Sequence, residues 1–283
     1  MKLITTLSIL ASLFLVSCQK EADFSNSSGN GGNNGGGTTG SGLLTKIVSK
    51  SGSDSSTLAF GYNTSKKIIT LNTTIVSGGT TSSVQERVER NSQGIITKLI
   101  IKSDLYQQSG FDSVETIIRY TGSKYTSRVT SFDAVVIVLK DSVSMIYDGT
   151  GKVVTEKDYV DFGTGSYEEK GKIDYTYSGS NIASIKNYSY DASSTSYSLE
   201  QTYTYDQYDS KISPMSMGIE GFLFDSAPFY SSNNPTKSSV SSPLGGTYTY
   251  TTTYTYNSSN KPVTAMSTIQ PGNSIATGTY YYQ

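Results

Sequence analysis

Hydrophobic and polar positions alternate with a period of two along most of the chain after residue 43. In residues 248–256, every tyrosine falls on one face of an extended strand, and all the threonines except Thr252 fall on the other. Residues 173–177 and 201–205 follow the same pattern. Successive side chains of a β-strand point to opposite faces, so this alternation predicts strands with one aromatic and one hydroxyl-bearing face.

A short sequence pattern that ends a predicted strand is repeated along this part of the chain. Each copy closes a strand-like segment just before a polar turn rich in Asn, Asp, Gly or Ser, and the copies recur about every 28 residues. Two strands of about 8–10 residues and two turns account for this period. The residues that end the strands, here called the anchors, are Tyr62, Arg90, Tyr120, Tyr147, Tyr177, Tyr205 and Tyr256.

These repeats predict an all-β fold. We expect a single curled antiparallel meander of about 14–16 strands, in the form of an open barrel or half-barrel, because a long sheet of twisted strands curls. Residues 134–139 interrupt the alternation with a continuous apolar run, which predicts a strand covered on both faces.

An insertion over residues 207–245 breaks the repeat. It holds Pro214, Pro228, Pro235 and Pro243, and Ser213 followed by Pro214 predicts a short helix that runs to about Phe224. A long segment inside a compact domain is often a lid or a binding loop, and the alternative is a hydrophobic plug that covers the sheet. The residues proposed for either role are Phe222, Phe224, Phe229 and Tyr230.

The turn sequences carry a resemblance to known families. The segment Tyr147-Asp148-x-x-Gly151-Lys152-Val153 resembles YD repeats, which build curled β shells in cell-surface proteins. Residues 43–283, with Tyr208-Asp209-Ser210-Lys211 and Asn233-Asn234-Pro235, resemble an uncharacterised family of outer-membrane lipoproteins with a porin-like β fold. The family implies this fold but no activity. Other copies of the turn begin with Asn63, Asn91, Thr121, Ser178 or Asn257 in place of Asp, which favours a role in turn geometry over ligand binding.

The amino terminus predicts export and lipid anchoring. Lys2 and the apolar stretch over residues 3–16 are typical of a signal peptide, which we expect to span residues 1–17. The apolar stretch is shorter than the ~20 residues that a transmembrane helix needs. Ser17 and Cys18 end a sequence that resembles a lipobox, and Cys18 is the only cysteine of the chain. We therefore expect Cys18 to carry acyl chains such as palmitate.

The residues after the lipid anchor predict a localisation signal and a flexible tether. Lys20, Glu21 and Asp23, within residues 18–23, resemble the surface-export signal of outer-membrane lipoproteins, and the alternative is a solvated tether on the periplasmic face. Residues 24–42 form a Gly/Ser/Asn-rich linker with a reach on the order of 25 Å. We expect a lipid-anchored outer-membrane protein whose repeat domain, residues 43–283, faces the extracellular side as a monomer.

Composition excludes several kinds of chemistry. The net charge of −1 gives no electrostatic basis for nucleic-acid binding. The chain has no histidine, which removes Ser-His-Asp triads and histidine-based zinc sites, and we expect no cofactor and no metal. Asp206 and Asp209 lack the ligand density of a calcium loop. Paired carboxylates could still hydrolyse a glycoside, and the candidates are Glu86, Glu89, Asp158, Asp161, Glu168 and Glu169.

Three functions fit the sequence. We expect a surface binding or adhesion module without catalysis, because tyrosine rings stack on sugars and Ser, Thr and Asn hydrogen-bond hydroxyl groups of a glycan or groups of a protein ligand. The first alternative is a structural scaffold of the cell envelope, in which tyrosine serves as a β-forming core residue. The second is a carbohydrate-active hydrolase that uses two of the carboxylates.

The lipid anchor is open to a direct test. The substitution Cys18→Ala removes the only thiol, so the protein should no longer incorporate radiolabelled palmitate and should leave the membrane fraction. Ser25→Ala is the control, because it keeps the thiol and lies in the linker outside the lipobox. Equal palmitate labelling of the Cys18→Ala protein and the parent would contradict the assignment.

Overall fold

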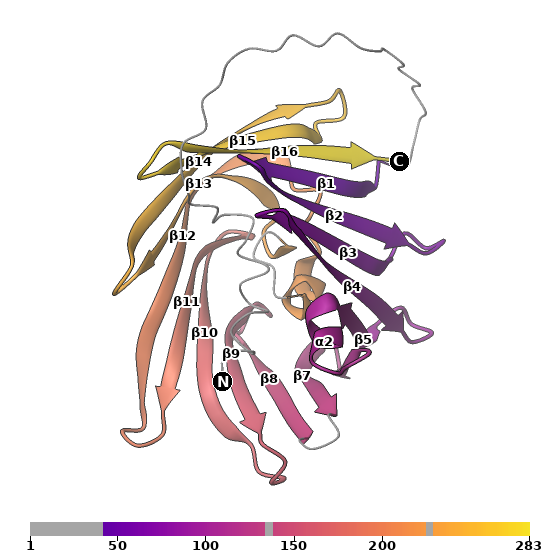
Figure 1. Cartoon of the computed structure of the whole chain (residues 1–283), viewed down its shortest axis with the longest axis vertical. Helices are drawn as coiled ribbons and strands as arrows, with labels where there is room; N and C mark the ends of the chain where they lie inside the picture. The colour runs from indigo at the N-terminus through magenta and orange to yellow at the C-terminus, as the bar shows by residue number, and fades with distance from the viewer. Residues whose placement is uncertain (1–41, 134–137, 225–228) are drawn as a thin grey trace.

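Sixteen antiparallel strands follow one another around a closed barrel (Figure 1). The computed structural model describes residues 42–133, 138–224 and 229–283. The strands are β1 (Leu44–Ser51), β2 (Asp54–Tyr62), β3 (Ile68–Ser77), β4 (Thr80–Arg90), β5 (Ile96–Ser103), β6 (Val114–Thr121), β7 (Lys124–Asp133), β8 (Val138–Tyr147), β9 (Val153–Asp161), β10 (Glu168–Ser178), β11 (Asn181–Asp191), β12 (Ser196–Ile212), β13 (Asn233–Ser242), β14 (Gly246–Tyr256), β15 (Pro262–Gln270) and β16 (Ser274–Tyr282). The predicted antiparallel meander is confirmed.

The first and last strands close the ring. β1 pairs with β16 from Leu44 opposite Tyr282 to Ser51 opposite Ala276. The prediction of an open barrel or half-barrel was therefore wrong. Period-two alternation reports which side chains face inward, but closure depends on the bend that accumulates from strand to strand, and alternation does not encode that bend.

A β-bulge beside the anchor residues supplies this bend. In six hairpins, the pairing register shifts where the even-numbered strand ends, so that one extra residue enters the odd-numbered strand. Tyr62 pairs with Ile68 while Gly61 pairs with Thr70, which leaves Ile69 unpaired. Bulges bend a strand and increase its twist. Their repetition around the sheet curves it enough to close.

The turns beside these bulges share one geometry. Oδ1 of Asp148 accepts the N–H groups of Thr150 and Lys152 at 2.8 and 3.0 Å, and Gly151 adopts a φ of 87°. The hydrogen bond from the backbone of Lys152 is the main cause that lowers the pKa of Asp148. Asn63, Asn91 and Asn257 accept backbone N–H groups in the same way. The first turn residue therefore acts in the turn, as predicted.

Tyrosine hydroxyl groups join neighbouring turns. At the end of an even-numbered strand, a tyrosine donates its O–H to the carbonyl near the start of the preceding odd-numbered strand. Tyr62 donates to Leu44 at 2.7 Å and Tyr147 to Tyr125 at 2.7 Å, and burial raises the pKa of both tyrosines to about 12, which keeps the donor proton in place. The same bond joins Tyr177 to Val153, Tyr208 to Ile182, Tyr254 to Pro235 and Tyr282 to Pro262.

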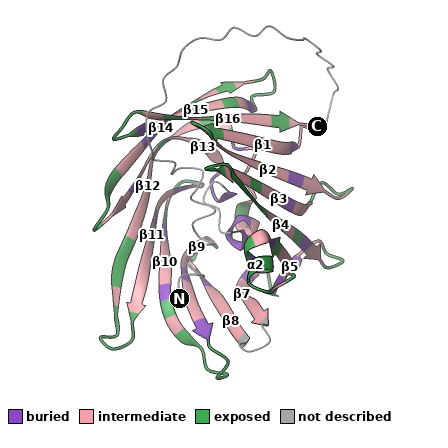
Figure 2. Ribbon diagram, viewed as in Figure 1, coloured by how far each residue is buried: buried purple, intermediate pink, exposed green. Residues whose placement is uncertain are grey.

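We call these bonds the tyrosine latches, and the end of the barrel that holds them the latched end. Arg90 replaces tyrosine in β4, because its Nε donates to the carbonyl of Ile68 at the start of β3. Both ends of the described chain meet here, since the N–H of Gly42 donates to the carbonyl of Gln283 at 2.7 Å. Most buried apolar residues belong to the parts of the strands near this end. Figure 2 marks the buried residues along the ribbon.

A short helix, α2 (Asp104–Gln108), lies between β5 and β6, where the sequence analysis expected none. Oγ of Ser103 caps it by accepting the N–H of Tyr106 at 3.1 Å. The Tyr106 ring packs edge-on against Phe132, 5.9 Å between centroids. Five residues are too few for helical periodicity to show in a sequence. The continuous apolar run falls mostly on residues 134–137, which lie outside the described residues.

The latches should contribute measurably to stability. In Tyr177→Phe, the carbonyl of the buried residue Val153 loses the O–H donor that lies 2.6 Å away. We expect the free energy of unfolding to fall by about 1–2 kcal/mol, measured by urea denaturation. Tyr281→Phe is the control, because that ring is 43% exposed on the outer face. Equal effects of the two substitutions would contradict the role of the latches.

Candidate functional site: a plug and a lysine-lined cleft at the latched end

The insertion enters the barrel at the latched end. β12 continues to Ile212 and β13 begins at Asn233, so the described residues of the insertion that lie outside strands are 213–224 and 229–232, a shorter stretch than the predicted 207–245. It contains a 3-10 helix, η1 (Gly218–Leu223), in place of the helix predicted from Ser213. Ser213 instead lies at the base of the insertion, where its N–H donates to the carbonyl of Ser232 at 2.8 Å and joins the two ends of this segment. We call residues 213–224 and 229–232 the plug.

The aromatic residues of the plug form the centre of the core. Phe222 stacks on Tyr230 with ring centroids 4.2 Å apart, and Tyr175 of β10 packs edge-on against both rings. Phe229 lies 6.4 Å from Phe60 of β2, so the plug touches opposite parts of the wall. The side chains of Phe222, Phe224, Phe229 and Tyr230 are buried. Of the two alternatives for these residues, this packing corresponds to the plug, and Pro228 lies outside the described residues.

A glycine allows the plug to fold back on itself. Gly221 lies so close to the backbone of Phe229 that a Cβ atom would sit 2.6 Å from the carbonyl oxygen. The N–H of Met217 also donates to that oxygen at 3.1 Å. Only a residue without a side chain permits this approach.

An ion pair fastens the plug to the wall. The guanidinium of Arg90 donates two hydrogen bonds to Glu220, at 2.7 and 2.9 Å, and a third to the carbonyl of Gly94 at 2.8 Å. The side chain of Arg90 is 6% exposed. Paired hydrogen bonds of this kind fix both direction and distance. Arg90 therefore joins the β4–β5 turn to η1.

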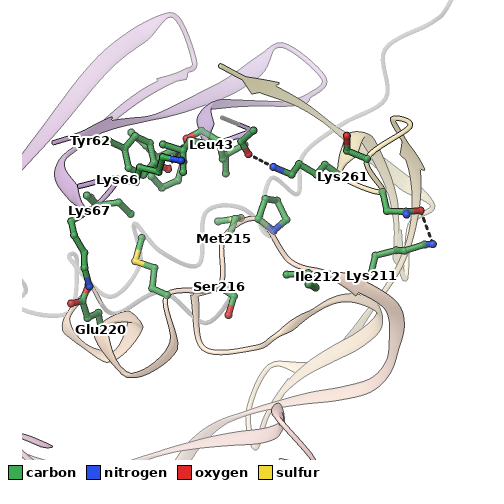
Figure 3. A pocket seen from close by; sticks show the side chains of 18 of the residues that line it. Leu43, Tyr62, Lys66, Lys67, Lys211, Ile212, Met215, Ser216, Glu220 and Lys261 are labelled. Carbon is green, nitrogen blue, oxygen red and sulfur yellow. Dashed lines mark hydrogen bonds between the residues drawn. The ribbon is translucent and has the colours of Figure 1, made fainter. Parts of the chain in front are cut away.

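A cleft of about 680 Å³ lies between the plug and the rim of the barrel. Phe60, Ile68, Met215 and Met217 give it apolar walls, and Ile212 at its edge is 79% exposed. Figure 3 shows Lys66 and Lys67 on one side, Lys211 and Lys261 on the other, and Met215 between them. The cleft therefore combines an apolar surface with a cationic rim.

The four lysines carry charge that the described residues leave uncompensated. Nζ of Lys211 donates to Oδ1 of Asn260 at 2.8 Å, and Nζ of Lys261 donates to the carbonyl of Gly42, so both partners are neutral. Among the described residues, no carboxylate forms an ion pair with any of the four lysines. Glu220 also lines the cleft, but Arg90 neutralises it. The cleft is therefore suited to an anion.

The carboxylates considered for catalysis lie in separate environments. Glu86 and Asp158 are on the inner face, whereas Glu89 pairs with Arg87, and Glu169 pairs with Lys157 at 3.1 Å. Oδ1 of Asp161 accepts two N–H groups of the loop that follows β9, and Glu168 lies 3.9 Å from Lys170.

The carboxylates considered for calcium are also separated. Oδ1 of Asp209 accepts the N–H groups of Lys211 and Asn234, while its Oδ2 accepts the side chains of Asn234 and Tyr256. Asp206 is exposed. Over the part of the chain that the structure describes, no cluster of three potential metal ligands occurs.

The predicted lipid-anchor residue Cys18, and Lys20, Glu21 and Asp23, lie outside the described residues. No described helix has the length and apolar character required to cross a membrane. The sequence analysis missed the cleft lysines. Lys66, Lys67 and Lys261 recur in the turns that follow anchor residues, which was the available signal, but nothing local places Lys211 beside them.

The plug should depend on its ion pair. Glu220→Gln leaves the charge of Arg90 buried without its partner, so we expect the free energy of unfolding to fall by about 1–3 kcal/mol in urea denaturation. The control is Glu89→Gln, which breaks an exposed pair with Arg87 and should change stability by less than about 1 kcal/mol. A smaller loss for Glu220→Gln than for Glu89→Gln would contradict this role.

Comparison with known proteins identifies the fold. No family model matches the chain, and no curated protein matches it. A porin-like protein from Bacteroides uniformis superposes with a TM-score of 0.53 over 85% of this chain and 98% of its own, at 12% identity. A porin-like protein from Bacteroides vulgatus gives a TM-score of 0.52 over 86% and 99%, at 14% identity. The chain thus shares the fold of proteins described as porin-like.

Proposed function

We propose that this chain is a lipid-tethered, water-exposed barrel of the outer membrane that serves as a non-catalytic binding module rather than as a pore. The observation that carries the proposal is the polarity of β14, whose outer face carries threonines and whose inner face carries tyrosines. In β14, Thr249, Thr251 and Thr253 face outward, whereas Tyr250 faces inward and is 1% exposed. A transmembrane barrel has the opposite arrangement, with an apolar band toward lipid.

Charged side chains on the outer face support the same conclusion. Arg87 and Glu89 form an exposed pair on β4, and Lys98 of β5 pairs with Glu115 of β6 at 3.1 Å. Placing a lysine or arginine on the lipid-facing side of a barrel at the bilayer midplane costs about 2–4 kcal/mol. These outer strands are therefore stable in water and unfavourable in lipid.

The position of residue 42 gives the tethered barrel an orientation. Gly42 lies at the latched end, so a lipid on Cys18 would hold that end toward the membrane and leave the other end facing outward. The motif of Lys20, Glu21 and Asp23 supports the extracellular side. The plug at the latched end opposes passage along the barrel axis.

A binding role is supported by the cleft, whose volume falls within the range of small-molecule sites, about 300–1,000 Å³. A scaffold without a ligand is the second candidate, and the burial of Phe222 and Tyr230 favours it because those rings serve the core. If the protein is a scaffold, its deletion should impair the envelope, whereas substitution of the cleft lysines should not. If it is a binding module, substitution of the cleft lysines should abolish its function.

Cysteine labelling tests the exposure of the wall. Thr251→Cys places a thiol on the outer face of β14, and Thr252→Cys places one on the inner face of the same strand. Cys18 is expected to be acylated, so each variant carries one free thiol. On intact cells, a membrane-impermeant maleimide should label Thr251→Cys rapidly and Thr252→Cys slowly, and the purified protein should give no conductance steps in planar bilayers.

The outcomes separate the alternatives. Labelling of Thr251→Cys only after the outer membrane is permeabilised would place the barrel on the periplasmic side and overturn the extracellular assignment. Protection of Thr251→Cys in membranes until detergent is added would show that lipid covers this face. That result, or defined conductance steps, would overturn the proposal of a water-exposed barrel.

A further inference from the structure

We propose that the lysine-lined cleft binds a free single-chain anionic amphiphile, with the acidic head between the lysines and the adjacent alkyl chain against the apolar walls. The proposal rests on the proposed function, because it names the ligand of that binding module. A cationic rim and apolar walls lie together in one cavity of about 680 Å³.

The cationic rim selects the head group. Lys66 and Lys67 lie on one wall and Lys211 and Lys261 on the other, so an anion between them faces ammonium groups from both sides (Figure 3). Each ammonium group has three donors, and the hydrogen bonds to Asn260 and to the carbonyl of Gly42 use one donor each of Lys211 and Lys261. Donors therefore remain for the oxygens of a carboxylate, sulfate or phosphate.

The apolar walls select a chain. The thioether side chains of Met215 and Met217 adapt their shape to a flexible ligand. Ile212, at the edge of the cleft, is 79% exposed, so an alkyl chain beside it would remove apolar surface from water. A small inorganic anion would leave these surfaces uncovered, and a neutral lipid would leave the lysines without a partner.

The shape of the cleft favours a free amphiphile over an intact membrane surface as its ligand. The cleft is bounded on one side by the plug, whose aromatic residues are buried in the barrel, and on the other by the β2–β3 and β14–β15 turns. A flat layer of head groups contacts the tips of such turns but does not reach apolar walls between them. One chain with one acidic head fits both the charge and the recess.

Titration calorimetry on the intact chain with Cys18→Ala gives the test, with dodecanoate below its micellar concentration as the probe. The parent should bind dodecanoate, and binding should weaken as salt is raised. Methyl dodecanoate lacks the charge and acetate lacks the chain, so both should bind at least about tenfold more weakly, a difference of about 1.4 kcal/mol.

Paired substitutions locate the site. Lys66→Gln with Lys67→Gln removes two exposed charges of the rim and should raise the Kd for dodecanoate about tenfold. Lys50→Gln with Lys186→Gln is the matched control, because it removes two exposed lysines that do not line the cleft. Met215→Gln should weaken dodecanoate binding while leaving the salt dependence intact.

Several results would overturn the inference. These are equal affinity for dodecanoate and its methyl ester, equal affinity for acetate and dodecanoate, or no effect of the Lys66 and Lys67 substitutions. Sedimentation with phosphatidylglycerol vesicles that depends on these lysines, without dodecanoate binding, would assign the rim to a membrane surface. Binding that emerges only after Glu21→Gln and Asp23→Asn would assign the cleft to the chain's own amino-terminal segment. The labelling of Thr251→Cys is independent of all these results, so the proposed function can stand when this inference fails.

Discussion

The tyrosine latch is the interaction on which the rest of the barrel depends. Each latch joins the end of one strand to the beginning of its neighbour, at the point where a bulge has shifted the register. The ring contributes to the core while its hydroxyl satisfies a backbone carbonyl that the bulge displaces from regular pairing. Phenylalanine could supply the ring but not the hydrogen bond, which favours tyrosine at the latch positions.

The latches and the plug support each other. The latches hold the inner faces of the strands at one end in a ring, and the plug fills that ring with Phe222, Phe229 and Tyr230. Arg90 takes part in both, because it donates to the carbonyl of Ile68 as a latch and to Glu220 of the plug as an ion pair. A change at Arg90 therefore affects the curvature of the wall and the seating of the plug together.

Much of this architecture was accessible from the sequence, and the remainder was not, for physical reasons. Alternation and the recurring anchors predicted the antiparallel meander. The Asn and Asp residues that begin the turns, such as Asn63 and Asp148, predicted the geometry of those turns. Closure was missed because the pairing of Leu44 with Tyr282 joins the two ends of the domain. The ion pair of Arg90 with Glu220 was missed because its partners are 130 residues apart in the sequence. Such contacts depend on three-dimensional curvature, for which a single sequence has no local pattern.

The candidate site shows the same division. The composition of the insertion identified Phe222 and Tyr230 as unusual, but a plug and a binding loop have the same composition, and only the packing around Tyr175 distinguishes them. The lysines of the cleft were overlooked because each one, taken alone, is an ordinary turn residue. Their proximity arises where the β2–β3 turn, the plug and the β14–β15 turn meet.

The plug also constrains how this barrel can evolve. Barrel diameter grows with strand number, and a sheet built from two-strand repeats can gain or lose a hairpin by duplication or deletion. A barrel with one hairpin fewer would be narrower and one with a further hairpin would be wider, so either change would alter the packing of Phe222 and Tyr230 against the wall. A change in the number of repeats would therefore call for a matching change in the residues packed inside.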